Sequence, residues 1–221
     1  MPRVACNHGL EYAFEPAATA FVAIDMQRDF LDAEGYLAAA GDDISSLRAI
    51  IPRFAGVLAA AREAGLTVIH TREGYAGDLS DMHDLKRERA SAGQPGPLGR
   101  FLIRGEAGHD TVPELYPQPG EVVIDKPGFG AFYRTELDAV LADRGITHLV
   151  LAGVTTQCCV HSTLRQAVDR GYRCLTLEDC CAAVDPALHE AAISLIYGEN
   201  HLFGWVATVD DFLETLAPLT C

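Results

Sequence analysis

The sequence is poor in lysine, and positive charge is scarce in it. Only two of its 221 residues are lysines, against fifteen arginines, and the formal net charge is −14 with a pI near 4.8. Such a charge argues against binding to nucleic acid or to an anionic membrane surface, because both would repel the chain. We therefore expect a small-molecule partner, with no nucleic acid and no membrane involved.

Long apolar runs are also missing, and no leader is expected. No uninterrupted apolar stretch approaches the roughly 20 residues that a bilayer requires. The N-terminus carries Arg3, His8 and Glu11 where a signal peptide needs an apolar core. These absences predict a cytoplasmic protein.

Cysteine is plentiful, but CxxC spacing is absent. An odd number of cysteines, mostly in apolar runs, is typical of reduced thiols, and adjacent pairs disfavour a structural zinc site. The seven lie at positions 6, 158, 159, 174, 180, 181 and 221. We expect Cys6, Cys174, Cys180, Cys181 and Cys221 to be small buried hydrophobes.

Apolar strand-like runs alternate with helix-like segments along the chain, and 49% of its residues are hydrophobic. This alternation predicts an α/β protein, a three-layer doubly wound sheet of about six mostly parallel strands, in one domain over residues 1–221. Gly65, Gly145 and Gly171 each end a helical run before the next strand. The predicted strands are 19–25, 67–71, 121–125, 148–152, 173–177 and 203–207, and the predicted helices are 44–64, 133–144, 158–171, 187–198 and 209–216.

The segment 73–120 interrupts this alternation. It is rich in glycine, proline and charge and is longer than a connector needs to be. A short helix is expected near 82–90. An excursion of this kind is usually a lid or specificity loop over the strand ends, and a disordered insertion is the alternative.

Three chemically active side chains follow predicted strands. Asp25 closes a fully apolar strand, Lys126 ends a β-branched one before Pro127 and Gly128, and Cys159 follows a strand through a short turn. Because the carboxyl ends of parallel strands form one crevice, an acid, an amine and a thiol can meet there. Such a group predicts a cysteine hydrolase centre.

Each of the three also has a simpler interpretation. Most buried cysteines are small core residues, a lysine at a strand end is often solvated, and Asp25 could be a plain N-cap. Against this, a buried unpaired Asp25 would be costly, and a thiol at a helix start has a lowered pKa that favours the thiolate. The pattern alone does not choose between Cys158 and Cys159.

Three ordered motifs resemble those of the isochorismatase-like cysteine hydrolases. They are AIDMQRDF at 23–30, DKPGFGAF at 125–132 and GVTTQCCV at 153–160, within a resemblance that covers roughly residues 18–210. The family's Cys-Val order implies that Cys159 is the nucleophile, with Asp25 and Lys126 as its catalytic partners. The resemblance also implies a cis Val154-Thr155 peptide and an oxyanion hole made by the Thr155 and Cys159 N–H groups.

Within that family the chain is most similar to amidohydrolases of linear ureides. Residues 70–74, 95–100, 104–106 and 113–117 resemble the biuret enzymes, whereas 203–206 resemble the ureidoacrylate enzymes. No cofactor is implied. Nicotinamidases hold a metal through an Asp-x-His element that follows the first strand, where this chain has Asp42-Asp43, so no metal is expected. We expect a homo-oligomer, a dimer or a tetramer.

The leading hypothesis is therefore cysteine-dependent hydrolysis of a small ureide through an acyl-thiol intermediate. The alternatives are a hydrolase of another small amide, such as a nicotinamide-like compound or an N-carbamoyl amino acid, a non-catalytic binding module, and a redox-sensing Cys158-Cys159 pair.

Substrate specificity is expected to come from a basic stretch and one aromatic residue. The segment 86–104 reverses the acidic balance of the chain and could clamp a polar or anionic substrate, in its own subunit or a neighbouring one; a solvated basic loop is the simpler interpretation. Its basic residues are Lys86, Arg87, Arg89, Arg100 and Arg104. We expect Arg87, Arg89, Arg100 and Phe30 to contact the substrate.

Overall fold

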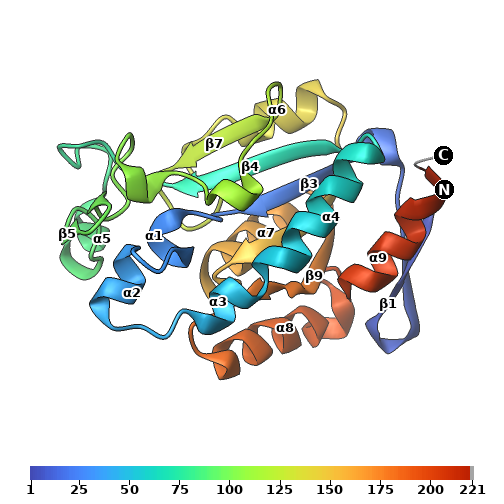
Figure 1. Cartoon of the computed structure of the whole chain (residues 1–221). Helices are drawn as coiled ribbons and strands as arrows, with labels where there is room; N and C mark the ends of the chain where they lie inside the picture. Colours follow the sequence, from blue (N-terminus) through green and yellow to red (C-terminus); the bar gives the residue numbers. More distant parts are fainter. Residues whose placement is uncertain (220–221) are drawn as a thin grey trace.

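The structure is a computed structural model that describes residues 1–219, so Cys221 and its predicted burial lie outside the described residues. A six-stranded sheet runs through the molecule in the order β10-β9-β8-β3-β4-β7, and all its neighbouring strands are parallel (Figure 1). This confirms the predicted doubly wound architecture. The strands are β3 (Thr19–Ile24), β4 (Thr67–Glu73), β7 (Val122–Lys126), β8 (His148–Val154), β9 (Arg173–Ala182) and β10 (Trp205–Ala207).

Both faces of the sheet are covered because side chains alternate along each strand. In β3, Phe21 and Ala23 join one apolar cluster, whereas Ala20, Val22 and Ile24 join the other. The first cluster includes residues of α3, α4 and α9, and the second includes residues of α6, α7 and α8. The helices are α1 (Arg28–Leu31), α2 (Tyr36–Ala40), α3 (Ser45–Ala49), α4 (Ile51–Glu63), α5 (Asp84–Arg89), α6 (Leu137–Asp143), α7 (His161–Asp169), α8 (Pro186–His201) and α9 (Val209–Leu216).

Several boundaries differ from the predicted ones. The predicted helix 44–64 divides at Ile50 into α3 and α4, since Pro52 fits only in a first helical turn. The predicted helix 158–171 starts as a π-helical turn over Thr156–Val160 before α7. An antiparallel hairpin that the sequence did not predict, β1 (Arg3–Cys6) with β2 (Leu10–Ala13), packs near α9 (Figure 1).

The segment between β4 and β7 forms a small apolar cluster of its own. It contains α5, whose bounds fall within the helix predicted near 82–90. It also contains a short hairpin of β5 (Pro95–Gly96) and β6 (Gly99–Arg100). Phe101 stacks on Tyr36 at a ring-centroid distance of 4.1 Å, and the Leu102 N–H donates to buried Asp29. These contacts tie the segment to α1 and α2. Among the described residues, no helix has the length and apolarity to cross a bilayer.

The sheet order places a switch point between β3 and β8. From β3 the chain moves outward through β4 to β7, and from β8 it moves outward in the other direction through β9 to β10. In open α/β sheets a ligand crevice lies beyond the carboxyl ends of the strands where the order reverses. Asp25 follows β3 directly and Cys159 follows β8.

Candidate active site

Asp25, Lys126 and Cys159 meet at this switch point. Lys126 Nζ lies 2.7 Å from Asp25 Oδ2, and both side chains are fully buried. Cys159 is buried, and its Sγ lies within 4.8 Å of a carboxylate oxygen of Asp25. The acid, amine and thiol that the sequence placed at three strand ends therefore form one cluster.

The backbone around Asp25 is held in an uncommon conformation. Asp25 has a φ of 52°, in the left-handed region, and its N–H donates to the Thr71 carbonyl oxygen. The Thr71 hydroxyl donates to Asp25 Oδ1 at 2.7 Å. Strained residues of this kind concentrate at functional sites, where surrounding contacts hold them in place. Here those contacts aim the carboxylate at Lys126.

Cys159 lies in the π-helical turn Thr156–Val160. The Cys158 and Val160 N–H groups both donate to the Thr155 carbonyl oxygen, and the Val154–Thr155 peptide is cis. The interaction with the Cys158 thiol, followed by burial, raises the pKa of Cys159. Burial and the two neighbouring carboxylates therefore oppose the lowering of this pKa that the helix start was expected to give. Cys158 and Cys159 are both free thiols.

The charges of Asp25 and Lys126 stabilise each other. Burial raises the pKa of Asp25, and the attraction of Lys126 only partly offsets this. Burial alone would lower the pKa of Lys126, but Asp25 and its other anionic neighbours raise it above the usual range. The ammonium is therefore charged at neutral pH, and Asp25 is a stronger base than an ordinary aspartate.

Glu73 is the second carboxylate of the site and was missed as a site residue by the sequence analysis. It ends β4 and pairs in register with Lys126 on β7. Its Oε2 accepts from the Cys159 thiol at 3.4 Å and lies 3.7 Å from Lys126 Nζ. Gln27, also buried, fixes its backbone by donating to the Glu73 carbonyl oxygen and accepting from the Glu73 N–H.

Lys86, on α5, is the second ammonium of the site. Its Nζ lies 2.6 Å from Glu73 Oε1, and the Tyr75 hydroxyl donates to the same oxygen at 2.7 Å. The Lys86 ammonium also lies over the Phe129 ring, 3.7 Å from its centroid. Burial by itself raises the pKa of Glu73, but Lys126 and Lys86 outweigh it and lower that pKa. Both of the chain's lysines are thus buried in one cluster.

A small cavity of about 170 Å³ opens onto the thiol. Its walls are largely apolar. They come from α1, the β4–β7 segment, the loop that follows β7 and the turn that contains Cys159. The lining residues are Phe30, Glu73, Lys86, Ala90, Ala92, Phe101, Leu102, Phe129, Thr155, Cys158 and Cys159. Phe30, the aromatic residue expected to contact the substrate, is among them.

The three arginines expected to contact substrate do not line this cavity. Arg87 donates to the carbonyl oxygens of Leu79 and Met82, and Arg100 pairs with Glu106. Arg89 is exposed. In the described residues, the cation that does reach the cavity is Lys86, from the same basic segment.

The comparisons with known proteins agree with this geometry. The family model for the isochorismatase domain matches residues 19–211. The chain belongs to the isochorismatase family. This confirms the resemblance drawn from the three sequence motifs.

Individual members of the isochorismatase family align over most of the chain. A protein of Variovorax paradoxus (strain S110) named ureidoacrylate amidohydrolase RutB is 35% identical over 216 residues, covering 94% of this chain and 85% of the relative. The crystal structure of a cysteine hydrolase from Pseudomonas syringae pv. phaseolicola 1448A gives a TM-score of 0.83 at 26% identity, with 99% of both chains covered. That of N-carbamoylsarcosine amidase from Thermoplasma acidophilum gives 0.68 at 26% identity, covering 87% of this chain and 96% of that one.

In this isochorismatase-family chain, the geometry of the cluster is that of an ion-paired network and not that of a metal site. Ligand atoms of Asp25, Glu73 and Cys159 lie within 4.8 Å of one another, a spacing that could hold a cation. Lys126 Nζ, however, lies 2.7 Å from Asp25 and 3.7 Å from Glu73. An ammonium at this position already neutralises the carboxylates and would repel a divalent ion.

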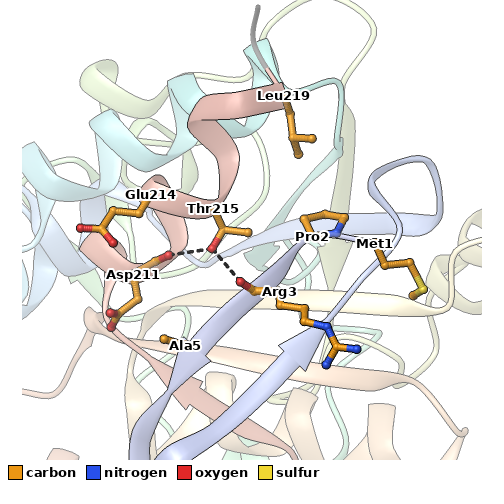
Figure 2. Close-up of a pocket in the computed structure, with 8 residues that line it drawn as sticks. All are labelled: Met1, Pro2, Arg3, Ala5, Asp211, Glu214, Thr215 and Leu219. Atoms are coloured by element: carbon orange, nitrogen blue, oxygen red, sulfur yellow. Dashed lines mark hydrogen bonds between the residues drawn. The ribbon is translucent and has the colours of Figure 1, made fainter.

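A larger cavity, of about 660 Å³, lies elsewhere and lacks comparable chemistry. Figure 2 shows Asp211 and Glu214 of α9 on one side of it and Met1 and Arg3 of the N-terminal segment on the other, with the Arg3 side chain directed away from both acids. It lies beside β1 and α9, at the opposite end of the molecule from α5 and β5 (Figure 1). The small cavity at the switch point, which holds the thiol, is therefore the candidate active site.

Proposed function

We propose that this chain is a cysteine-dependent amidohydrolase that cleaves a C–N bond of a small linear ureide or carbamoyl compound, such as biuret, through an acyl-thiol intermediate. The observation that carries the proposal is the buried Asp25–Lys126 pair beside the Cys159 thiol in a small cavity. A volume of about 170 Å³ suits a substrate smaller than a drug-sized ligand. The ureidoacrylate amidohydrolase and N-carbamoylsarcosine amidase names of two relatives support a carbamoyl substrate.

In the first step the Cys159 thiol loses its proton to Asp25 and attacks the substrate carbonyl carbon. Asp25 is the better base of the two neighbouring carboxylates, because burial raises its pKa whereas Lys126 and Lys86 lower that of Glu73. Lys126, which contacts both carboxylates, stabilises the thiolate as it forms.

The negative charge that develops on the carbonyl oxygen needs donors, and the Thr155 and Cys159 N–H groups are those we assign. An oxyanion-hole donor is typically worth about 3 kcal/mol in the transition state. Asp25 then gives its proton to the leaving ammonia or amine, and the C–N bond breaks. A water that loses its proton to the same carboxylate cleaves the acyl-thiol bond, which releases the acid and restores the thiol.

The test is ammonia release from a substrate panel. Wild-type protein is assayed with biuret, ureidoacrylate, N-carbamoyl amino acids, nicotinamide and simple amides. We expect turnover of ureides, its loss in Cys159→Ala and Cys159→Ser, and most activity retained in the matched variant Cys158→Ala. An inactive Cys158→Ala with an active Cys159→Ala would reverse the assignment of the nucleophile, and no ureide turnover would refute the substrate class.

Chelation provides a second measurement. Since Lys126 supplies the positive charge of the cluster, EDTA should leave the rate of the purified protein unchanged. Activity that EDTA removes and zinc restores would contradict the metal-free mechanism.

A further inference from the structure

The two oxygens of Glu73 have unequal surroundings. Oε1 is held by two close donors, Lys86 Nζ at 2.6 Å and the Tyr75 hydroxyl at 2.7 Å. Oε2 has longer contacts, with the Cys159 thiol at 3.4 Å and Lys126 Nζ at 3.7 Å. Because the thiol gives up its proton to Asp25 in the proposed mechanism, Oε2 then loses this donor and is the atom prepared to accept from a ligand.

The charge on Glu73 is maintained by its neighbours. Lys126 and Lys86 outweigh burial and lower the pKa of Glu73, so that the carboxylate is ionised and can only accept. Lys86 thereby acts as a positioning residue. It donates to Oε1 of Glu73, so that the other oxygen, Oε2, faces the thiol. A ligand group bound at Oε2 must therefore be a hydrogen-bond donor.

The donor must lie next to the carbon that Cys159 attacks. Oε2 is 3.4 Å from Sγ, so it reaches an atom one bond away from a carbon bound by that sulfur. Apolar side chains, including Phe30, Phe101 and Leu102, form much of the remaining wall. In a simple amide the substituent that stays on the attacked carbon is a carbon atom, whereas in a ureide it is an N–H group.

We propose that Glu73 Oε2 accepts a hydrogen bond from the N–H group that remains on the acyl carbon, which makes the site selective for carbamoyl carbons over the carbonyl carbons of simple amides. This inference rests on the proposed amidohydrolase function and assigns its substrate selectivity to one residue. A carboxylate here also repels an anionic group attached directly to the attacked carbon.

Biuret and malonamide form a matched pair of probes, because they differ by a central N–H in the first and CH₂ in the second. Their affinities are measured calorimetrically with the Cys159→Ala protein, in which neither is consumed. We expect biuret to bind about tenfold more tightly or better, as for a hydrogen bond to a charged acceptor. Equal affinities, or no biuret binding, would overturn the inference even if every Glu73 variant failed to fold.

The second measurement adds Glu73→Gln to the Cys159→Ala protein. This change keeps the size of the side chain but removes its charge, so the biuret-to-malonamide affinity ratio should fall toward one while malonamide binding changes little. Glu121→Gln is the matched control, since Glu121 precedes the opposite end of β7 and pairs with Arg62; it should retain the ratio. An equal loss of both ligands in Glu73→Gln would mean a merely structural role.

These outcomes separate the two proposals. If wild-type protein hydrolyses ureides but the Cys159→Ala protein does not discriminate between the probes, the role of Glu73 is wrong and the proposed function stands. If wild-type protein hydrolyses simple amides and no ureide, the proposed function fails, and selectivity for carbamoyl carbons fails with it.

Discussion

Four buried ionic side chains define the site at the scale of single residues. Asp25 and Glu73 carry negative charge, Lys126 and Lys86 balance it, and the neutral Cys159 thiol lies among them. Each charge is costly to bury alone and is tolerated because it is paired. Removing one member should therefore disturb the protonation of the others as well as its own contacts.

Lys126→Arg tests whether the shape of the cation matters. Lys126 Nζ contacts Asp25 at 2.7 Å and donates to the Gly128 carbonyl oxygen at 2.9 Å in a fully buried space. A planar guanidinium cannot replace this compact ammonium, so we expect kcat to fall by about 100-fold or more. Steady-state kinetics with the best ureide substrate measure this. Near-wild-type rates would mean that only the charge is needed.

Gly153→Ala tests the backbone that brings β8 against β3. Gly153 has a φ of 135°, and an added Cβ would lie 2.0 Å from the Ile24 carbonyl oxygen. We expect a loss of about 3 kcal/mol in the free energy of unfolding, measured by urea denaturation. Gly56→Ala on α4 is the matched control, since no atom lies within 4 Å of its added Cβ. It should be neutral or stabilising, and equal losses in both variants would contradict the argument.

The sequence could place three residues in the candidate site because Asp25 and Lys126 lie at the ends of apolar strands and Cys159 follows one through a short turn. Glu73 satisfies the same criterion, but the apolar pattern of its strand stops at 71 while the observed β4 continues to Glu73. Extending the predicted strand by two residues would have found it. Lys86 gave no such signal, since its burial depends on its contact with Glu73, 13 residues earlier in the chain, which local sequence does not encode.

At the scale of elements, the alternation of strands and helices was predictable and the β4–β7 segment was less so. The parallel strands have continuous apolar runs, which mark them clearly. The hairpin of β1 and β2 lacks such a run, and its contacts with α9 come from the far end of the chain. The walls that Phe101 and Leu102 give to the cavity likewise depend on long-range contacts with α1 and α2.

The arginines of the β4–β7 segment provide the prediction at this scale. Arg87 donates to the Leu79 and Met82 carbonyl oxygens, and Arg100 donates to that of Gly77 and pairs with Glu106. Alanine at either position should loosen the wall that carries Lys86 and raise KM a few-fold while sparing kcat. Arg89, which is exposed, provides the comparison. Arg89→Ala would raise KM only if this side chain contacts the substrate directly. Unchanged kcat and KM in all three variants would mean that these arginines belong to a solvated basic loop and do not affect substrate binding.

At the scale of the whole molecule, the net charge of −14 makes acid stability informative. Glu121 joins α4 to the start of β7: Arg62 Nε and Nη2 donate to its two oxygens at 2.7 and 2.9 Å, and His70 Nε2 lies 2.9 Å away. Burial alone would raise the pKa of Glu121, but the hydrogen bonds of Arg62, the Gln118 N–H and His70 lower it to about 2. This carboxylate is thus more acidic in the folded chain than in the unfolded one.

A carboxyl group whose pKa is lowered by folding stabilises the folded state above its unfolded pKa of about 4.3, and this contribution is lost as pH falls toward the folded value. Glu121→Gln removes it. We expect the variant to melt a few degrees below wild type at pH 7, for a contribution of about 1 kcal/mol after solvent screening, with the two curves converging between pH 4.5 and about 2. Thermal melts across this range measure the difference, with Glu214→Gln, an exposed glutamate on α9, as the control. A gap that widens on acidification would show that the ion pair of Glu121 with Arg62 does not stabilise the fold.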